Sequence, residues 1–161
     1  MNSLNPISLP PIVSREAWLT ARKLLLQREK EITRLRDEVN AARRRLPMVK
    51  IETPYRFEGP DGPIDLLGLF EGRRQLFVHH FMWFGDRQAF CLGCTGAAQT
   101  GFNNPRFREA LHGRDVTFVA ISRAPWEQIA RVKEKHGWTF PWYSSHGTNF
   151  NTDFHTTLDE A

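Results

Sequence analysis

Cys91 and Cys94 are the only cysteines of the chain, and they lie two residues apart in the segment Phe90-Cys91-Leu92-Gly93-Cys94. Two thiols at this spacing can close a small disulfide ring where a loop turns into a helix, and can then cycle between dithiol and disulfide. A helix start presents free N–H groups and the positive end of the helix dipole, so a cysteine there ionises more readily. The spacing therefore indicates thiol–disulfide redox chemistry.

The roles of the two thiols stay open on this evidence. Cys91, expected at an exposed turn, would attack a disulfide or a peroxide, and Cys94, one turn into the helix, would resolve the mixed intermediate; the alternative assigns the attack to Cys94. Arg123 follows a second apolar segment and could approach the thiols, which would favour the thiolate. Its alternative role is to bond loop carbonyls. Cys91, Cys94 and Arg123 are therefore the candidate catalytic residues.

A metal site is the competing interpretation of the same cysteines. Structural zinc normally takes four ligands, and the chain has no further cysteine. Its histidines include no pair at the His-x₃₋₅-His spacing of zinc fingers. The third interpretation is that the two cysteines have this spacing by chance and no function depends on it. We expect redox chemistry first, and we assign no metal and no cofactor.

Length and composition predict one ordinary globular domain. A chain of 161 residues with 25% charged and 12% aromatic residues is long enough to bury a core. It contains no apolar run of about 18 residues, and its start lacks the charged and apolar regions of a signal peptide. Two cysteines are too few for a secreted disulfide scaffold. We therefore expect a cytoplasmic protein with no membrane contact.

A long helix is predicted near the N-terminus. Met1 to Val13, with three prolines, should form an extended arm, and Ser14 can cap a helix that reaches Leu46 and is stopped by Pro47. We expect its apolar stripe to pack on the chain's own domain, with a coiled-coil partner helix from a second subunit as the next alternative. The stripe consists of Trp18, Ala21, Leu25, Ile32, Leu35, Val39, Ala42 and Leu46.

The net charge of +4 belongs mainly to this helix. Residues 15–45 carry ten Lys/Arg against five Asp/Glu, so the rest of the chain is close to neutral. A nucleic-acid site would interleave its basic face with aromatic residues that stack on bases. Trp18 is the only aromatic residue in the segment, so we expect solvated basic side chains and no nucleic-acid partner.

Strand-like and helix-like segments alternate in the remainder. Apolar runs predict strands at residues 75–84, 115–122 and 139–145, with a kinked helix ending at His112 and a second helix starting at Pro125 between them. This order predicts right-handed crossovers and a three-layer α/β sandwich with a mostly parallel central sheet. Ligands of such sheets bind beyond the carboxyl ends of the strands.

His80 should not belong to that ligand-binding edge. At about 3.3 Å per residue it would lie about 13 Å before the end of the first strand. Its neighbour His79 should point to the opposite face of the sheet. We therefore expect His80 to be a hydrogen-bonded core residue.

Several short motifs run along most of the chain. They include the segment Trp18 to Leu25, Arg44-Arg45-Leu46-Pro47, Leu69-Phe70-Glu71-Gly72-Arg73, His80-Phe81-Met82, Gly93-Cys94, Arg123-Ala124-Pro125, Phe140-Pro141-Trp142-Tyr143-Ser144-Ser145 and Phe150-Asn151-x-Asp153-Phe154. Over about Trp18 to Phe154, the set resembles the thioredoxin-like bacterial family catalogued as domain of unknown function 899.

The resemblance implies a thioredoxin-like fold related in layout to peroxiredoxins, without an established reaction. Its Gly-Cys element falls on Gly93-Cys94, which in a peroxiredoxin-type comparison makes Cys94 the attacking thiol and Cys91 the resolver. Relatives continue beyond Phe154 with a β-hairpin and a closing helix. The resemblance therefore implies that these pieces are missing here, leaving an exposed sheet edge that a second subunit or the N-terminal arm would cover.

Together, these observations predict a thiol–disulfide oxidoreductase or a peroxiredoxin-like protein that acts on a protein thiol, a disulfide or a peroxide. The alternatives are a redox-silent thioredoxin-fold module that binds another protein and a thiolate carrier of copper(I) or zinc. The expected organisation is an arm of residues 1–13 and one domain of residues 14–161 that includes the helix 14–46, with a homodimer as one expected assembly.

Overall fold

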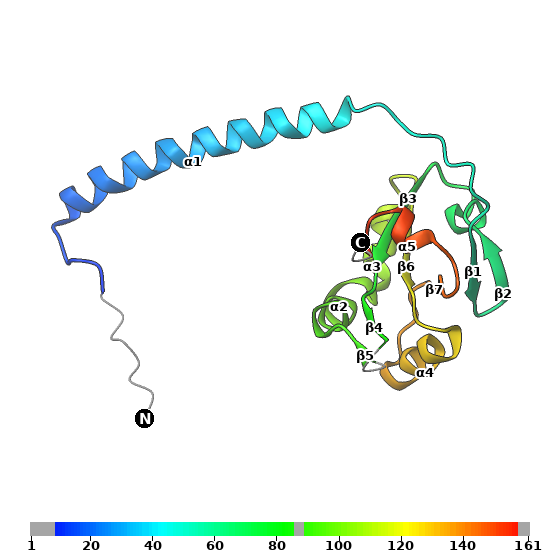
Figure 1. The fold of residues 1–161 in the computed structure, drawn as a ribbon. Helices are drawn as coiled ribbons and strands as arrows, with labels where there is room; N and C mark the ends of the chain where they lie inside the picture. Colours follow the sequence, from blue (N-terminus) through cyan, green and yellow to red (C-terminus); the bar gives the residue numbers. More distant parts are fainter. Residues whose placement is uncertain (1–8, 86–88, 158–161) are drawn as a thin grey trace. The chain divides into compact units, whose positions relative to one another are not determined.

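The computed structural model describes residues 9–85 and 89–157. Contacts between Cα atoms divide the chain into two compact units, residues 1–51 and 52–161. The first unit contains the helix α1 (Arg15–Arg44), and the second contains the sheet and the shorter helices (Figure 1).

Helix α1 forms where the sequence predicts it, within two residues at each end. The Ser14 hydroxyl accepts a hydrogen bond from the N–H of Ala17 at 3.2 Å and so caps the first turn. The last helical residue, Arg44, lies three positions before Pro47. Most of the predicted N-terminal arm, residues 1–8, lies outside the described residues. No residue of α1 is buried.

A five-stranded mixed sheet forms the centre of the second unit. Its strand order is β2 (Gly62–Asp65), β1 (Arg56–Gly59), β7 (Trp142–Ser144), β6 (Val116–Ser122), β3 (Gln75–His80). The pairings β3–β6 and β6–β7 are parallel, whereas β1 pairs antiparallel with both β2 and β7. The prediction of a mostly parallel sheet is therefore wrong, because the hairpin β1–β2 adds to β7 in the opposite direction.

Helices connect the three parallel strands. Between β3 and β6 the chain forms α2 (Leu92–Ala97), the π-helical turn η2 (Ala98–Phe102) and α3 (Pro105–His112). Helix α4 (Trp126–His136) connects β6 to β7, and the short elements η1 (Gly68–Phe70) and α5 (Phe150–Asp153) complete the unit. The predicted end of α3 at His112 is confirmed, and α4 begins one residue after the predicted start at Pro125.

Strand β6 is covered on both faces. Phe118 and Ala120 belong to a buried cluster with residues of the helices, and Val119 and Ile121 belong to a second cluster on the other face. Such alternation along a strand places successive side chains in two different cores. The core therefore fixes the carboxyl end of β6, which leads directly to Arg123.

The apolar run at residues 75–84 forms two strands rather than one. Strand β3 ends at His80, and the N–H of Phe81 donates to the carbonyl of Ile121 at 2.7 Å. Trp83 and Phe84 then form β4, which pairs antiparallel with β5 (Ala89–Phe90) in a separate two-stranded sheet. Figure 1 shows β5 leading into α2. The prediction that His80 lies deep within a strand is wrong, because His80 is the last residue of β3.

Candidate functional site

Cys91 occupies the N-cap position of α2. Its φ and ψ of −60° and 129° are extended, while the next residue is already helical. The N–H of Cys91 donates to the carbonyl of Met82 at 3.1 Å, and both the N–H and the hydroxyl of Thr95 donate to the carbonyl of Cys91 at 3.0 Å. These bonds hold the first cysteine at the junction of loop and helix, as the sequence predicts.

The surroundings of Cys91 favour its thiolate. The thiol makes no capping hydrogen bond of regular geometry, but the N–H groups of Cys94 and Gly93 face the sulfur and lower the pKa of Cys91. Burial raises that pKa, and the thiol of Cys94 lowers it by a smaller effect. Backbone N–H groups at a helix start therefore act on this thiol as the sequence argument requires.

Cys94 has the opposite electrostatic character. Burial raises the pKa of the Cys94 thiol, and the negative charge of an ionised Cys91 raises it further. The backbone of Met82 partly offsets these effects by hydrogen bonding to the sulfur. Both residues are thiols in the structure, with partly exposed side chains. The pair thus combines one thiol that ionises readily with one that holds its proton.

Arg123 does not act on either thiol. Its guanidinium Nη1 donates to the hydroxyl of Thr157 at 3.1 Å, and its carbonyl lies 3.2 Å from Nδ1 of His146. None of the effects that shift the pKa of Cys91 or of Cys94 comes from this arginine. The structure therefore places Arg123 just after the carboxyl end of β6, as predicted, but its guanidinium donates to a hydroxyl group.

His80, which the sequence analysis expected in the core, belongs to a polar cluster. Nδ1 of His80 lies 3.1 Å from the Thr156 hydroxyl and 3.4 Å from Nδ2 of Asn151. Asn151 in turn accepts a hydrogen bond from the Ser145 hydroxyl at 2.5 Å. Burial, and then the charge of His79, lower the pKa of His80, so its imidazole is neutral near neutral pH.

This polar cluster borders a small cavity of about 90 Å³. Its lining includes His80, Met82, Arg123 and Asn151. Met82 links the cavity to the thiols, because its carbonyl accepts from the Cys91 N–H and its backbone contacts the sulfur of Cys94. The carboxyl ends of β3 and β6 therefore bring a histidine and an arginine to the same edge as the cysteine loop.

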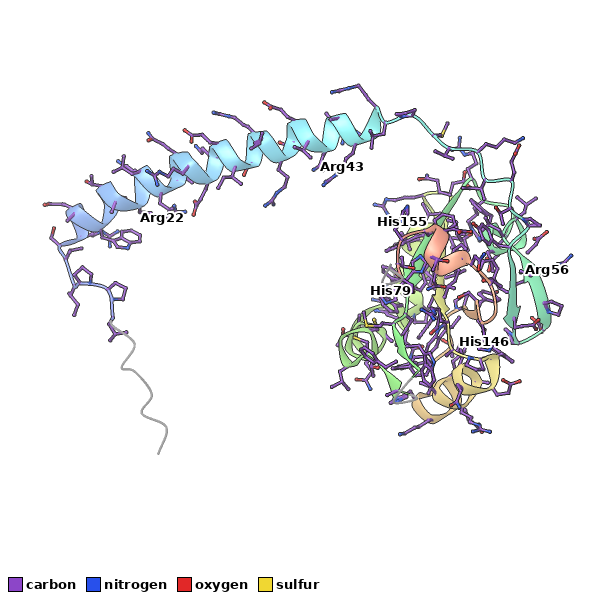
Figure 2. The ribbon with its side chains drawn as sticks, in the orientation of Figure 1. Arg22, Arg43, Arg56, His79, His146 and His155 are labelled. Atoms are coloured by element: carbon purple, nitrogen blue, oxygen red, sulfur yellow. The ribbon has the colours of Figure 1, made fainter. Side chains whose placement is uncertain are left out.

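A larger cavity of about 610 Å³ opens beside it, and Arg123 and Trp83 line both. Ser145, His146 and the following loop form the rest of its wall. Figure 2 labels His146 at this end of the unit and His79 on β3. Such a cavity has room for a peptide side chain or a small thiol against the edge of the sheet.

Residues 9–85 and 89–157 contain no group of three or more His, Cys, Asp or Glu side chains placed to hold a metal ion. The same stretches contain no helix long and apolar enough to cross a membrane.

The fold and the site together define a mixed α/β protein with a Cys-x-x-Cys pair at a helix start. A family model described as "Bacterial protein of unknown function (DUF899)" matches residues 7–161, and the chain belongs to this family. The family expected from the sequence motifs is thereby confirmed. Neither a curated protein nor a solved structure matches the chain.

The sequence analysis found both cysteines and Arg123 but missed His80 and Asn151 as site residues. Both stand in motifs that carry the family resemblance, His80-Phe81-Met82 and Phe150-Asn151-x-Asp153-Phe154. A signal for His80 was therefore available. The two side chains are 71 positions apart in sequence, so no local pattern indicates that they meet.

Proposed function

We propose that this protein is a thiol–disulfide oxidoreductase in which Cys91 attacks a disulfide substrate and Cys94 resolves the intermediate. The observation that carries the proposal is the N-cap position of Cys91, where the N–H groups of Cys94 and Gly93 face the sulfur and lower the pKa of this thiol, whereas burial raises the pKa of Cys94. An attacking cysteine needs a populated thiolate near neutral pH. Cys94 would hold its proton until the mixed disulfide has removed the charge on Cys91.

The reduction of the substrate balances in atoms and electrons with the two thiols of the protein alone. The thiolate of Cys91 attacks one sulfur of the substrate disulfide, forms a mixed disulfide and releases the other sulfur as a thiolate. Cys94 then loses its proton to solvent and attacks the Cys91 sulfur, which releases the second substrate thiolate and leaves a Cys91–Cys94 disulfide. The substrate is reduced by two electrons and the protein is oxidised by two. An external dithiol restores the starting state.

A thioredoxin-like arrangement is part of the proposal. Strands β3, β6 and β7 are parallel neighbours joined by helices, and the cysteines follow β3 through the β4–β5 hairpin. This supports placing the thiols at the ligand-binding edge of a thioredoxin-like core. The antiparallel β1–β2 hairpin beside β7 is an addition to that core.

Peroxide reduction by Cys94 is less well supported than disulfide exchange. That reaction needs Cys94 as the thiolate, whereas burial raises its pKa. It also benefits from a cation beside the sulfur, and Arg123 instead bonds to Thr157. Disulfide exchange started by Cys91 fits both observations.

Trapping with a disulfide probe tests the proposal. Incubation with a small aromatic disulfide should leave a stable mixed disulfide on Cys91 in the Cys94→Ser chain, whereas the native chain should go on to the intramolecular disulfide. The Cys91→Ser chain is the matched control and should trap the probe at least several-fold more slowly. Intact mass distinguishes the three products. Faster trapping by Cys94, or no intramolecular disulfide at any ratio of oxidised to reduced dithiol, would contradict the proposal.

A further inference from the structure

One set of apolar side chains of α1 repeats every seven residues, whereas Leu19, Leu24 and Leu26 lie outside it. Trp18, Leu25, Ile32 and Val39 are separated by seven positions each, and Ala21, Leu35 and Ala42 lie three positions after the first, third and fourth of them. These are the a and d positions of a heptad repeat abcdefg. Since an α-helix has 3.6 residues per turn, a stripe of period 3.5 stays on one seam only when two helices wind around each other in a left-handed supercoil.

This stripe is exposed in the structure. Between 43% and 60% of the surface of Trp18, Leu25, Ile32, Leu35 and Val39 is accessible, and α1 contains no buried residue. The helix spans 30 residues, or about 45 Å at 1.5 Å per residue. Most helices of proteins gain their stability by packing an apolar face. We therefore expect the apolar seam of α1 to pack against a helix of similar length.

We propose that α1 pairs with α1 of a second copy of this chain in a parallel, in-register coiled coil. The argument for this occupant is charge complementarity at the g and e positions that flank the seam. In a parallel pair, a g residue faces the e residue five positions later on the other helix. Glu31 then faces Arg36 of the partner subunit, and Glu38 faces Arg43 of the partner subunit, and symmetry doubles both pairs.

The two glutamates of these contacts make no ion pair among the described residues, and Arg43 donates a hydrogen bond from Nη1 to Oδ1 of Asn40 at 3.0 Å. In the described part of the chain, α1 has one internal ion pair, between Arg22 and Glu29 at 2.9 Å. Figure 2 shows Arg22 and Arg43 among the side chains along the helix. The parallel register places no like charges opposite each other at the e and g positions.

The antiparallel alternative is electrostatically unfavourable. There, e residues face e residues and g residues face g residues. Full overlap of the two stripes would place Glu31 opposite Glu31 of the partner subunit, and Arg22 opposite Arg36 of the partner subunit. Because like charges across the seam destabilise a pair, the charge pattern selects the parallel orientation.

Arg28 interrupts the seam at a d position. In the parallel pair it lies next to Arg28 of the partner subunit and beside the e residue Glu29 of that helix. Charged residues at a seam position lower stability while fixing register. Arg28→Leu should therefore lower the dissociation constant of the dimer at least several-fold, whereas the charge reversals described below should raise it.

Charge reversal tests the pairing on the full chain, kept reduced so that no disulfide joins two copies. Sedimentation should show a dimer for the native chain, and the dissociation constant should rise by about tenfold or more for both E31R/E38R and R36E/R43E. An equimolar mixture of these two variants should again form dimers. A monomeric native chain, as expected if α1 packs on its own second unit, would overturn the proposal, and so would a mixture that stays monomeric.

Cross-linking tests the orientation. In a Cys91→Ser, Cys94→Ser background, Val39→Cys places one thiol at an a position, and mild oxidation should link the two copies almost completely because the parallel register brings the two sulfurs together. Thr33→Cys, at the outward b position, is the matched control and should link much less. Equal linking at the two positions, or none at residue 39 in a dimeric sample, would overturn the parallel register.

Discussion

At the residue scale, the two cysteines differ because of backbone geometry rather than neighbouring charges. Cys91 precedes the first helical turn, so the N–H groups of Gly93 and Cys94 face its sulfur, whereas Cys94 lies within that turn and is more buried. The four-residue segment Cys91-Leu92-Gly93-Cys94 thus contains two thiols of different acidity. This arrangement needs no basic side chain, which explains why Arg123 can bond elsewhere.

The pH dependence of alkylation should show this difference. The thiolate fraction grows as pH rises through the pKa, so a lowered pKa makes Cys91 reactive at a lower pH than an unstructured cysteine, whose pKa is about 8.5. At pH 7, iodoacetamide should modify Cys91 in the Cys94→Ser chain at least several-fold faster than Cys94 in the Cys91→Ser chain. In guanidinium chloride the two rates should become equal. Equal rates in the folded proteins would show that the helix start does not act on Cys91.

His79 should make the fold sensitive to acid. Its ring packs against Phe81 and Phe102, its Nε2 is buried without a hydrogen-bond partner among the described residues, and burial lowers its pKa. Since the unfolded chain then binds a proton more readily, this contribution to stability is present above about pH 6.5 and is lost as pH falls from there toward the lower folded pKa.

Replacing this imidazole should stabilise the protein. His79→Phe removes a buried nitrogen without a partner and should raise the free energy of unfolding by about 1 kcal/mol at pH 7, with a larger gain at pH 5. Urea denaturation at the two pH values measures both effects. His136→Phe, at an exposed position beside Trp138, is the control and should change little. A loss of stability in His79→Phe would show that the nitrogen has a solvent or protein partner.

At the element scale, the helices were predictable because their signals are local. Asn104 accepts a hydrogen bond from the N–H of Arg106 at 3.0 Å and stands before Pro105, and α4 ends at Gly137, whose φ of 63° is left-handed. Such caps are determined by a few neighbouring residues in the sequence. The Cys91 N-cap was predictable for the same reason.

The sheet was predicted less well because its strand pairings join segments that lie far apart in the sequence. The apolar run at 75–84 carries no sign that the chain leaves the sheet after His80, since that break depends on β4 pairing with β5 and on Phe81 bonding to Ile121. The antiparallel addition of β1 to β7 likewise joins segments more than 80 residues apart. The break after His80 moved this residue from the predicted core to the candidate site.

The two glycines that end α3 and α4 should respond differently to the same substitution. Gly137 has a positive φ, so Gly137→Ala should lower the free energy of unfolding by about 1 kcal/mol. Gly113 has a φ of −61°, and an added Cβ would meet its neighbours only at 3.6 Å or more, so Gly113→Ala should be neutral or slightly stabilising. Thermal unfolding of the two variants makes the comparison. Equal losses would mean that the backbone at residue 137 relaxes without cost.

At the scale of the whole molecule, the two units of the chain have different structural features. Both buried clusters, the cysteines and the two cavities lined by Arg123 belong to residues 52–161, whereas residues 1–51 provide a basic helix with an exposed heptad seam. The excess positive charge also lies in the first unit. We therefore expect folding and the proposed redox chemistry to depend on the second unit, and the proposed self-association to depend on the first.

Removing residues 1–51 should separate these properties. Because none of the core residues lies before Tyr55, a chain of residues 52–161 should unfold cooperatively, with Trp138 and Trp142 as buried fluorescent reporters, and should lose its dimer. Its thermal midpoint should be independent of protein concentration, whereas in the full chain the melting of α1, followed by circular dichroism, should have a midpoint that rises with concentration. Cys91 should keep its alkylation profile in both chains. If the shortened chain fails to unfold cooperatively, α1 contributes to the core of the second unit; if it stays dimeric, the association lies on the sheet unit instead.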